Sequence, residues 1–167
     1  MIKMHLYRCN PKEEVVMVIT FFGHRETPPD VHPMLQAQIE AFIRRYNECI
    51  FYVGNHGRFD AMVIHILSNM KKRFPHIQCV VALAYMPSAN NPKFPMGIET
   101  VVPEGIEKTP PRYAIIRRNR WMLEQADVVI TYVKYGVGGA SRFMEMARKK
   151  QKYVINLAAD TPFSAEP

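Results

Sequence analysis

The feature that most restricts the possible folds is a regular alternation of short apolar runs with longer amphipathic segments. Residues 15–22 form the first run, and their side chains are apolar at nearly every position. A strand that is apolar on both faces suits the middle of a parallel sheet that is covered by helices. Further runs of this kind follow at 50–53, 79–85, 127–132 and 153–157.

Segments with helical spacing separate these runs. The segment at about 32–48 repeats apolar side chains on one helical face, at Leu35, Ile39, Phe42, Ile43 and Tyr46. Similar segments occupy about 58–73, 112–126 and 140–150. Strands that alternate with helices predict a parallel sheet with helices on both faces and right-handed crossovers. We therefore expect an α/β fold, a Rossmann-like three-layer sandwich with a parallel five-stranded sheet in the order 3-2-1-4-5.

One segment, from Pro87 to Pro111, interrupts the alternation. It contains six prolines and Gly97, and proline removes a backbone donor and fits poorly into helices and central strands. We expect no regular element here, and long loops of this kind are often lids or linkers. We interpret residues 1–167 as a single domain with a core of about 15–157 and this proline-rich loop at 87–111.

Composition excludes several classes of protein. With 48% hydrophobic and 22% charged residues, the chain resembles an ordinary globular domain. No apolar run is long enough to span a bilayer, and the first ten residues lack a signal-peptide core, so we expect a cytoplasmic protein without membrane contact. The three cysteines form no CxxC pair, so we expect neither a zinc site nor a disulfide framework. We expect no metal and no cofactor.

The formal net charge of +7 favours an anionic partner, although it does not separate nucleotide, nucleic acid and membrane. The cations are unevenly distributed. Five of them fall within 108–120 with no acid among them: Lys108, Arg112, Arg117, Arg118 and Arg120. A second cluster, at 149–152, follows a helical segment, where the helix dipole itself favours positive charge.

Three glycine-containing turns follow predicted strands, at 23–25, 54–60 and 136–141. In such sheets ligands bind beyond the carboxyl ends of the strands, where free N–H groups at helix starts and arginine side chains can hold a phosphate. Asp60 could cap a helix or bind a ribose hydroxyl, and each turn alone could be purely structural. The predicted ligand-binding residues are Gly23, His24, Arg25, Gly54, Asn55, Asp60, Asn119, Arg120, Gly138, Gly139, Ala140 and Ser141.

Together these motifs resemble the DUF1273-like group of the SLOG superfamily, Rossmann-like domains related to the DNA-processing protein DprA and to the LOG enzymes. The resemblance covers roughly residues 15–157. It is carried by Phe22–Arg25, Gly54–Asp60, Asn119–Met122 with Ala126–Asp127, Gly138–Ala140, Ala147–Lys150 and Val154–Asn156. The second turn departs from the small apolar pattern of the group, because it reads Asn55-His56-Gly57-Arg58. The resemblance implies a homodimer or a higher homo-oligomer.

The LOG-type phosphoribohydrolases cleave the N-glycosidic bond of nucleoside monophosphates, which suggests one possible reaction. Gly138 and Gly139 match the diglycine of their motif, Glu145 falls where their catalytic glutamate would be, and Arg118 falls near their arginine. Ser141 and Arg142 replace the glycine and threonine of that motif. A carboxylate could stabilise oxocarbenium-like charge or activate water, but an acid on an amphipathic helix could equally face solvent.

The sequence thus favours a sensing or regulatory domain that binds a nucleotide or nucleotide-derived phosphorylated ligand at the carboxyl edge of the sheet. One alternative is a nucleotide N-glycosidase that uses Glu145 and Arg118. The other is DprA-like binding of nucleic acid. We rank this last alternative lowest, because only Tyr113 and Trp121 supply aromatic rings among the basic residues.

Overall fold

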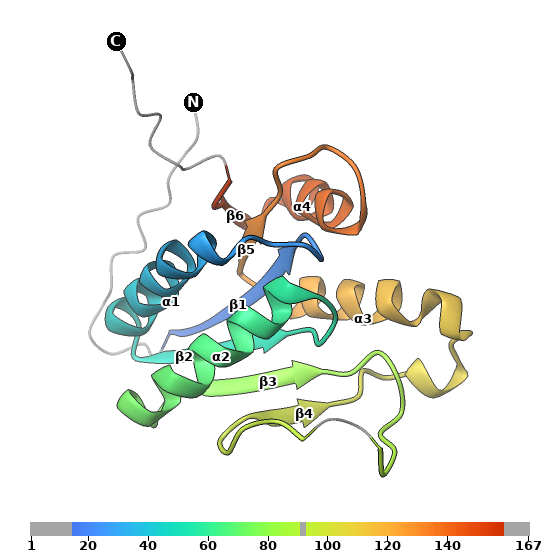
Figure 1. Cartoon of the computed structure of the whole chain (residues 1–167), viewed down its shortest axis with the longest axis horizontal. Helices are drawn as coiled ribbons and strands as arrows, with labels where there is room; N and C mark the ends of the chain where they lie inside the picture. Colours follow the sequence, from blue (N-terminus) through green and yellow to red (C-terminus); the bar gives the residue numbers. More distant parts are fainter. Residues whose placement is uncertain (1–14, 91–92, 159–167) are drawn as a thin grey trace.

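A computed structural model describes residues 15–90 and 93–158, which form a parallel sheet between two layers of helices (Figure 1). The sheet has six strands in the order β4-β3-β2-β1-β5-β6, and each neighbouring pair is parallel. The strands are β1 (Val16–Gly23), β2 (Glu48–Val53), β3 (Gln78–Ala82), β4 (Glu99–Val101), β5 (Val128–Tyr132) and β6 (Tyr153–Asn156).

Two helices cover each face of the sheet (Figure 1). One face carries α1 (His32–Arg45) and α2 (Arg58–Arg73), and the other carries α3 (Pro111–Gln125) and α4 (Gly139–Lys149). Short 3-10 helices occur at Pro29–Val31 and Ile106–Lys108. Within residues 15–90 and 93–158, no helix has both the length and the apolar character that crossing a bilayer requires.

The central strand β1 contributes to both cores. Ile19 and Phe21 are fully buried on the side of α1 and α2. Phe22 points to the opposite side, where its ring stacks on Phe143 of α4 with 5.0 Å between the centroids. This two-sided burial explains why residues 15–22 are apolar at nearly every position, and it confirms the α/β fold class.

The predicted order 3-2-1-4-5 corresponds to β3-β2-β1-β5-β6, but the predicted number of strands was wrong. The sixth strand, β4, lies within the proline-rich segment and pairs Glu99–Val101 with Val80–Ala82 of β3. Its three residues include no proline, and an edge strand needs partners on one side only. The expectation that 87–111 holds no regular element was therefore wrong, because proline counts say little about the short intervals between prolines.

Some element boundaries also differ from the sequence prediction. The first helix ends at Arg45 rather than at about residue 48, because Tyr46 has an extended backbone with φ −115° and ψ 142°. The third strand ends at Ala82. The apolar run continues beyond it because Leu83 and Ala84 are buried in the loop that follows. That residues 1–167 form one domain stays a prediction, since 1–14 and 159–167 lie outside the described residues.

Candidate nucleic-acid interface at the carboxyl edge of the sheet

Four loops converge at the carboxyl edge of the sheet, where α2, α3 and α4 also begin (Figure 1). Because β1 pairs with both β2 and β5, the turns that follow these three strands are neighbours. The loop after β3 lies next to the turn after β2. The strand order thus brings the three sequence-predicted turns to one edge of the molecule.

The turn after β1 connects the other two turns. His24 Nε2 accepts hydrogen bonds from the backbone N–H groups of Lys134 at 2.9 Å and Tyr135 at 3.3 Å. The carbonyl of Arg25 accepts a hydrogen bond of 2.9 Å from the N–H of Arg58 at the start of α2. Burial lowers the pKa of His24, which favours the neutral imidazole that this acceptor role requires.

Packing against α2 requires a glycine at position 23. A Cβ atom added at this position would lie only 2.1 Å from Cγ of Phe59, a buried residue in the first turn of α2. The absence of a side chain at Gly23 therefore lets α2 begin directly against the end of β1. The assignment of Gly23 to the ligand-binding residues stays a prediction.

We expect Gly23→Ala to lower the free energy of unfolding by roughly 1–3 kcal/mol, because the added methyl group overlaps the Phe59 ring. Urea unfolding measures the change. Gly136→Ala is the matched control, since no heavy atom of the described residues lies within 4 Å of a Cβ added at Gly136. Equal effects at the two glycines would contradict the packing explanation.

The turn after β2 is built around the buried side chain of Arg118, which is only 1% exposed. Its Nη1 donates hydrogen bonds to the carbonyl of Ala82 at 3.0 Å and to Oδ1 of Asn55 at 3.3 Å. Its Nε donates to Oδ1 of Asn119 at 2.7 Å. Arg118 therefore fastens α3 to the ends of β2 and β3, and Asn55 and Asn119 hold its guanidinium in place.

Asp60 completes this buried polar cluster. Its Oδ2 accepts a 3.0 Å hydrogen bond from the N–H of His56, which ties the turn after β2 to the first turn of α2, although no side chain of the described residues caps that helix. Burial raises the pKa of Asp60 to about 6, opposed by the charge of Arg118 and by the bond from His56. A Cβ added at Gly54 would lie 2.5 Å from Asp60 Oδ2 and 2.6 Å from Arg118 Nη1, so glycine makes room for both groups.

The turn after β5 is open, unlike the first two. Gly138 precedes α4 with a φ of 95°, a conformation that favours glycine, and no side chain in the described part of the chain caps the helix. No described heavy atom lies within 4 Å of a Cβ added at Gly138 or Gly139. Ala140 is half-buried and Ser141 is buried in the first helical turn. The free N–H groups of a helix start can bind an anion here.

Exposed tyrosines flank these turns, and two of them, Tyr85 and Tyr135, are not among the residues predicted from the sequence. Tyr135 is 62% exposed, and its ring centroid lies 5.6 Å from that of His24. The ammonium group of Lys134 lies 5.9 Å from the Tyr135 ring centroid. Tyr85, 44% exposed, lies 5.8 Å from the ring of His56. A signal for both existed, because each tyrosine falls within three residues of the end of a strand.

At the start of α3, Tyr113 is 48% exposed, and the guanidinium of Arg112 lies 4.7 Å from its ring centroid. Tyr113 is therefore an accessible aromatic ring on this edge, as its place in the basic stretch suggested. Trp121 is different, because it is half-buried and packs edge-on against Tyr52 at 5.0 Å. Arg120 is exposed on α3.

The two residues predicted to be catalytic occupy different environments. Glu145 is exposed on α4 and pairs with Arg148 at 2.6 Å, whereas Arg118 is buried and bonded to the ends of β2 and β3. Within residues 15–90 and 93–158, no hydrogen bond or ion pair joins the two side chains. Their catalytic roles stay predictions.

Within the same described residues, no cluster of three or more His, Cys, Asp or Glu side chains is suited to a metal.

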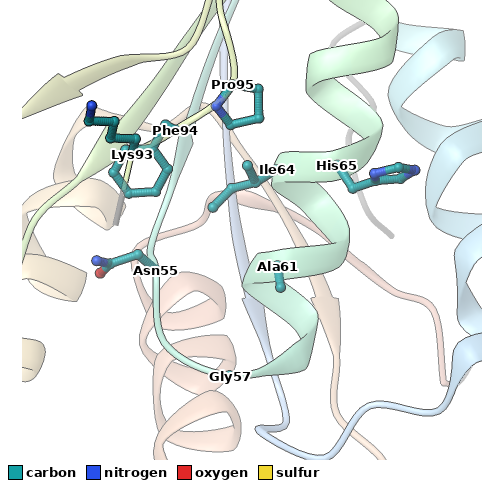
Figure 2. Close-up of a pocket in the computed structure, with 8 residues that line it drawn as sticks. All are labelled: Asn55, Gly57, Ala61, Ile64, His65, Lys93, Phe94 and Pro95. Atoms are coloured by element: carbon teal, nitrogen blue, oxygen red, sulfur yellow. The ribbon is translucent and has the colours of Figure 1, made fainter. Parts of the chain in front are cut away.

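A shallow pocket of about 370 Å³ lies between α2 and residues 93–95 (Figure 2). Its walls are mainly apolar, from Ala61, Ile64, Phe94 and Pro95, while Lys93 and His65 are at its margin. Asn55 and Gly57 also line it, so the pocket adjoins the turn after β2.

Comparison with known proteins shows the fold. No family model and no curated protein matches the chain. The X-ray structure of DNA processing protein A (DprA) from Streptococcus pneumoniae is similar, with 13% identity, a TM-score of 0.56, and coverage of 83% of this chain and 49% of that one. DNA processing protein A from Helicobacter pylori, described with a unique single-stranded DNA binding mode, has 16% identity, a TM-score of 0.55, and coverage of 83% and 63%.

This chain thus spans between about half and under two thirds of the two DprA chains. At these identities the similarity establishes a shared Rossmann-like fold and nothing finer. The relation to DprA-type folds that the sequence motifs implied is confirmed at that level. Membership of the DUF1273-like group stays a prediction.

Proposed function

We propose that the carboxyl edge of the sheet binds single-stranded nucleic acid. The observation that carries the proposal is the open turn at Gly138 and Gly139, bordered by exposed tyrosines that lie beside cationic or imidazole groups. A phosphate would occupy the start of α4, and unstacked bases would lie on Tyr135, Tyr85 and Tyr113. Proteins that bind single strands combine aromatic stacking with a positively charged surface in this way.

Two further facts support this choice over the other functions. The chain carries a formal charge of +7, and exposed cations, including Arg25, Arg58, Lys134 and Arg142, lie in or next to the turns at this edge. The fold is shared with DprA, and the Helicobacter pylori protein is described as binding single-stranded DNA. Against a glycosidase, Glu145 is exposed and already paired with Arg148.

A free nucleotide is the second candidate ligand, and one observation favours it. The pocket of about 370 Å³ adjoins the start of α2 through Asn55 and Gly57, and its apolar walls suit a planar base (Figure 2). A nucleotide phosphate and a strand phosphate would use the same chemistry at a helix start.

With either ligand, we infer that the chain is a single SLOG-type domain. The resemblance to that group implies a homodimer, and size-exclusion chromatography of the purified protein tests it.

Fluorescence anisotropy with a labelled oligothymidylate tests the proposal. We expect binding that weakens steeply as salt rises, because phosphate contacts release counterions. AMP and ADP-ribose at millimolar concentration should compete poorly, since each engages only part of the surface. Absence of oligonucleotide binding in low salt would overturn the proposal, and tight competition by AMP would transfer it to the nucleotide.

A further inference from the structure

His24 stands out because its side chain holds a loop of a different strand. Its Nε2 accepts two backbone N–H groups, from Lys134 and Tyr135, at 2.9 and 3.3 Å. These two residues begin the segment that leads to Gly138 and Gly139. The His24 ring also packs edge-on against Tyr132 at 6.1 Å and tilted against Tyr135 at 5.6 Å.

An imidazole nitrogen that accepts hydrogen bonds carries no proton, so the proton of neutral His24 resides on Nδ1. A protonated imidazole is a donor at both nitrogens and can accept neither N–H group. Lys134 through Gly139 are all exposed. Other hydrogen bonds hold the two ends of the loop, between Asn156 and Val133 before it and from the N–H of Arg142 to the carbonyl of Gly138. Between these ends, the positions of Lys134 and Tyr135 depend on the protonation state of His24.

We propose that His24 is a positioning residue for the loop from Lys134 to Gly139, and that its protonation in mild acid releases the loop and weakens nucleic-acid binding. The second claim, weaker nucleic-acid binding in acid, rests on the proposed function. The first claim, the hold of His24 on the loop, concerns the free protein and is tested separately.

The charges around His24 agree with the proposal. On its own turn the charged neighbours are Arg25 and Glu26, and Glu26 pairs with Arg58 at 3.7 Å. From the other side, β5 contributes Tyr132 and the facing loop contributes Lys134 and Tyr135. No acid in the described part of the chain forms a hydrogen bond or an ion pair with the ring, and burial lowers the pKa of His24 below the ordinary value of 6.5. His24 therefore stabilises the loop above that value, and the stabilisation is lost as the pH falls through the lower folded-state pKa.

The expected pH dependence is opposite to the usual one. The chain has six histidines, and their protonation adds positive charge, which ordinarily strengthens binding to a polyanion. We expect instead that affinity for oligothymidylate falls about tenfold from roughly pH 8 to roughly pH 5, because two loop hydrogen bonds are lost.

Two variants separate positioning from a merely structural role. His24→Gln keeps an amide oxygen that can accept the same bonds but cannot titrate, so it should bind at pH 8 and lose the acid-induced weakening. His24→Leu removes the acceptor and should bind weakly at every pH. His76→Gln is the matched control. His76 is exposed beside Phe74 in the loop before β3, at the amino edge of the sheet, so this variant should keep the wild-type dependence of affinity on pH.

Hydrogen exchange of residues 134–139 in the free protein completes the test. After correction for intrinsic rates, exchange should accelerate in acid for the wild type and stay constant for His24→Gln. Exchange that does not change with pH in the wild type would overturn the inference. Accelerated exchange without oligonucleotide binding at any pH would support the hold of His24 on the loop and overturn the proposed function instead.

Discussion

Arg118→Met is expected to lower the free energy of unfolding by about 3–5 kcal/mol, the usual effect of removing one partner from a buried polar cluster. Methionine fills similar space but leaves the carbonyl of Ala82 and the side chains of Asn55 and Asn119 without the guanidinium that they now bind. Asp60 also loses the positive charge that opposes its rise in pKa. Urea unfolding at pH 8 measures the loss.

The size of this effect should depend on pH. Burial already raises the folded-state pKa of Asp60 to about 6, so its contribution to stability is present in acid and is lost as the pH rises through that value. Without Arg118 the pKa of Asp60 rises further, so the difference between wild type and variant should grow from pH 5 to pH 8, by about 1 kcal/mol or more.

Arg120→Met is the control, because Arg120 is exposed on the same helix. Surface substitutions of this kind usually change the unfolding free energy by no more than about 0.5 kcal/mol. If the Arg118 and Arg120 variants were equally stable, Arg118 would not be the structural centre of this edge, and a direct role in ligand binding would have to be reconsidered.

The double variant Tyr85→Ala with Tyr135→Ala is expected to lose more affinity for the oligonucleotide than any other variant proposed for this edge. Stacking on an aromatic side chain contributes about 1–3 kcal/mol per base, which corresponds to roughly a 5- to 150-fold loss of affinity for each ring. Tyr85 is 44% exposed and Tyr135 is 62% exposed, so their removal should leave the fold unchanged. Anisotropy titrations at fixed salt measure the change in affinity.

Tyr153→Ala provides the matched control for the tyrosine variants. Tyr153 is 64% exposed, but it is the first residue of β6 and so lies at the amino edge of the sheet. We expect its removal to leave oligonucleotide affinity within about twofold of wild type. Because stacking involves no phosphate, the salt dependence of the double variant should match that of the wild type.

Much of the fold can be predicted from the sequence, because the apolar runs at 15–22 and 127–132 and the helical spacing between them report burial directly. The exception is β4. Its residues, Glu99–Val101, are half-buried or exposed at an edge and carry no apolar run, so their pairing with β3 is decided by tertiary structure. A local pattern cannot reveal a strand of that kind.

The candidate site could be predicted less completely. Strand order was enough to bring His24, Asn55 and Gly138 to one edge. The sequence could not show that Gly23 packs against Phe59 while Gly138 faces open space, because both are glycines that follow a strand. It also could not show that Arg118 is buried and Arg120 exposed, since neighbouring arginines in one helix differ only in the face on which they lie.

The most direct test of the central claim is to map the nucleic-acid footprint by amide chemical shifts during titration with oligothymidylate. We predict that perturbed amides concentrate at 24–25, at 85 and at 134–141, on the carboxyl edge. The opposite edge offers a basic alternative, with Lys71, Lys72, Arg148 and Lys149 near the ends of α2 and α4. A footprint confined to that edge, with the Gly138 turn unaffected, would contradict the account.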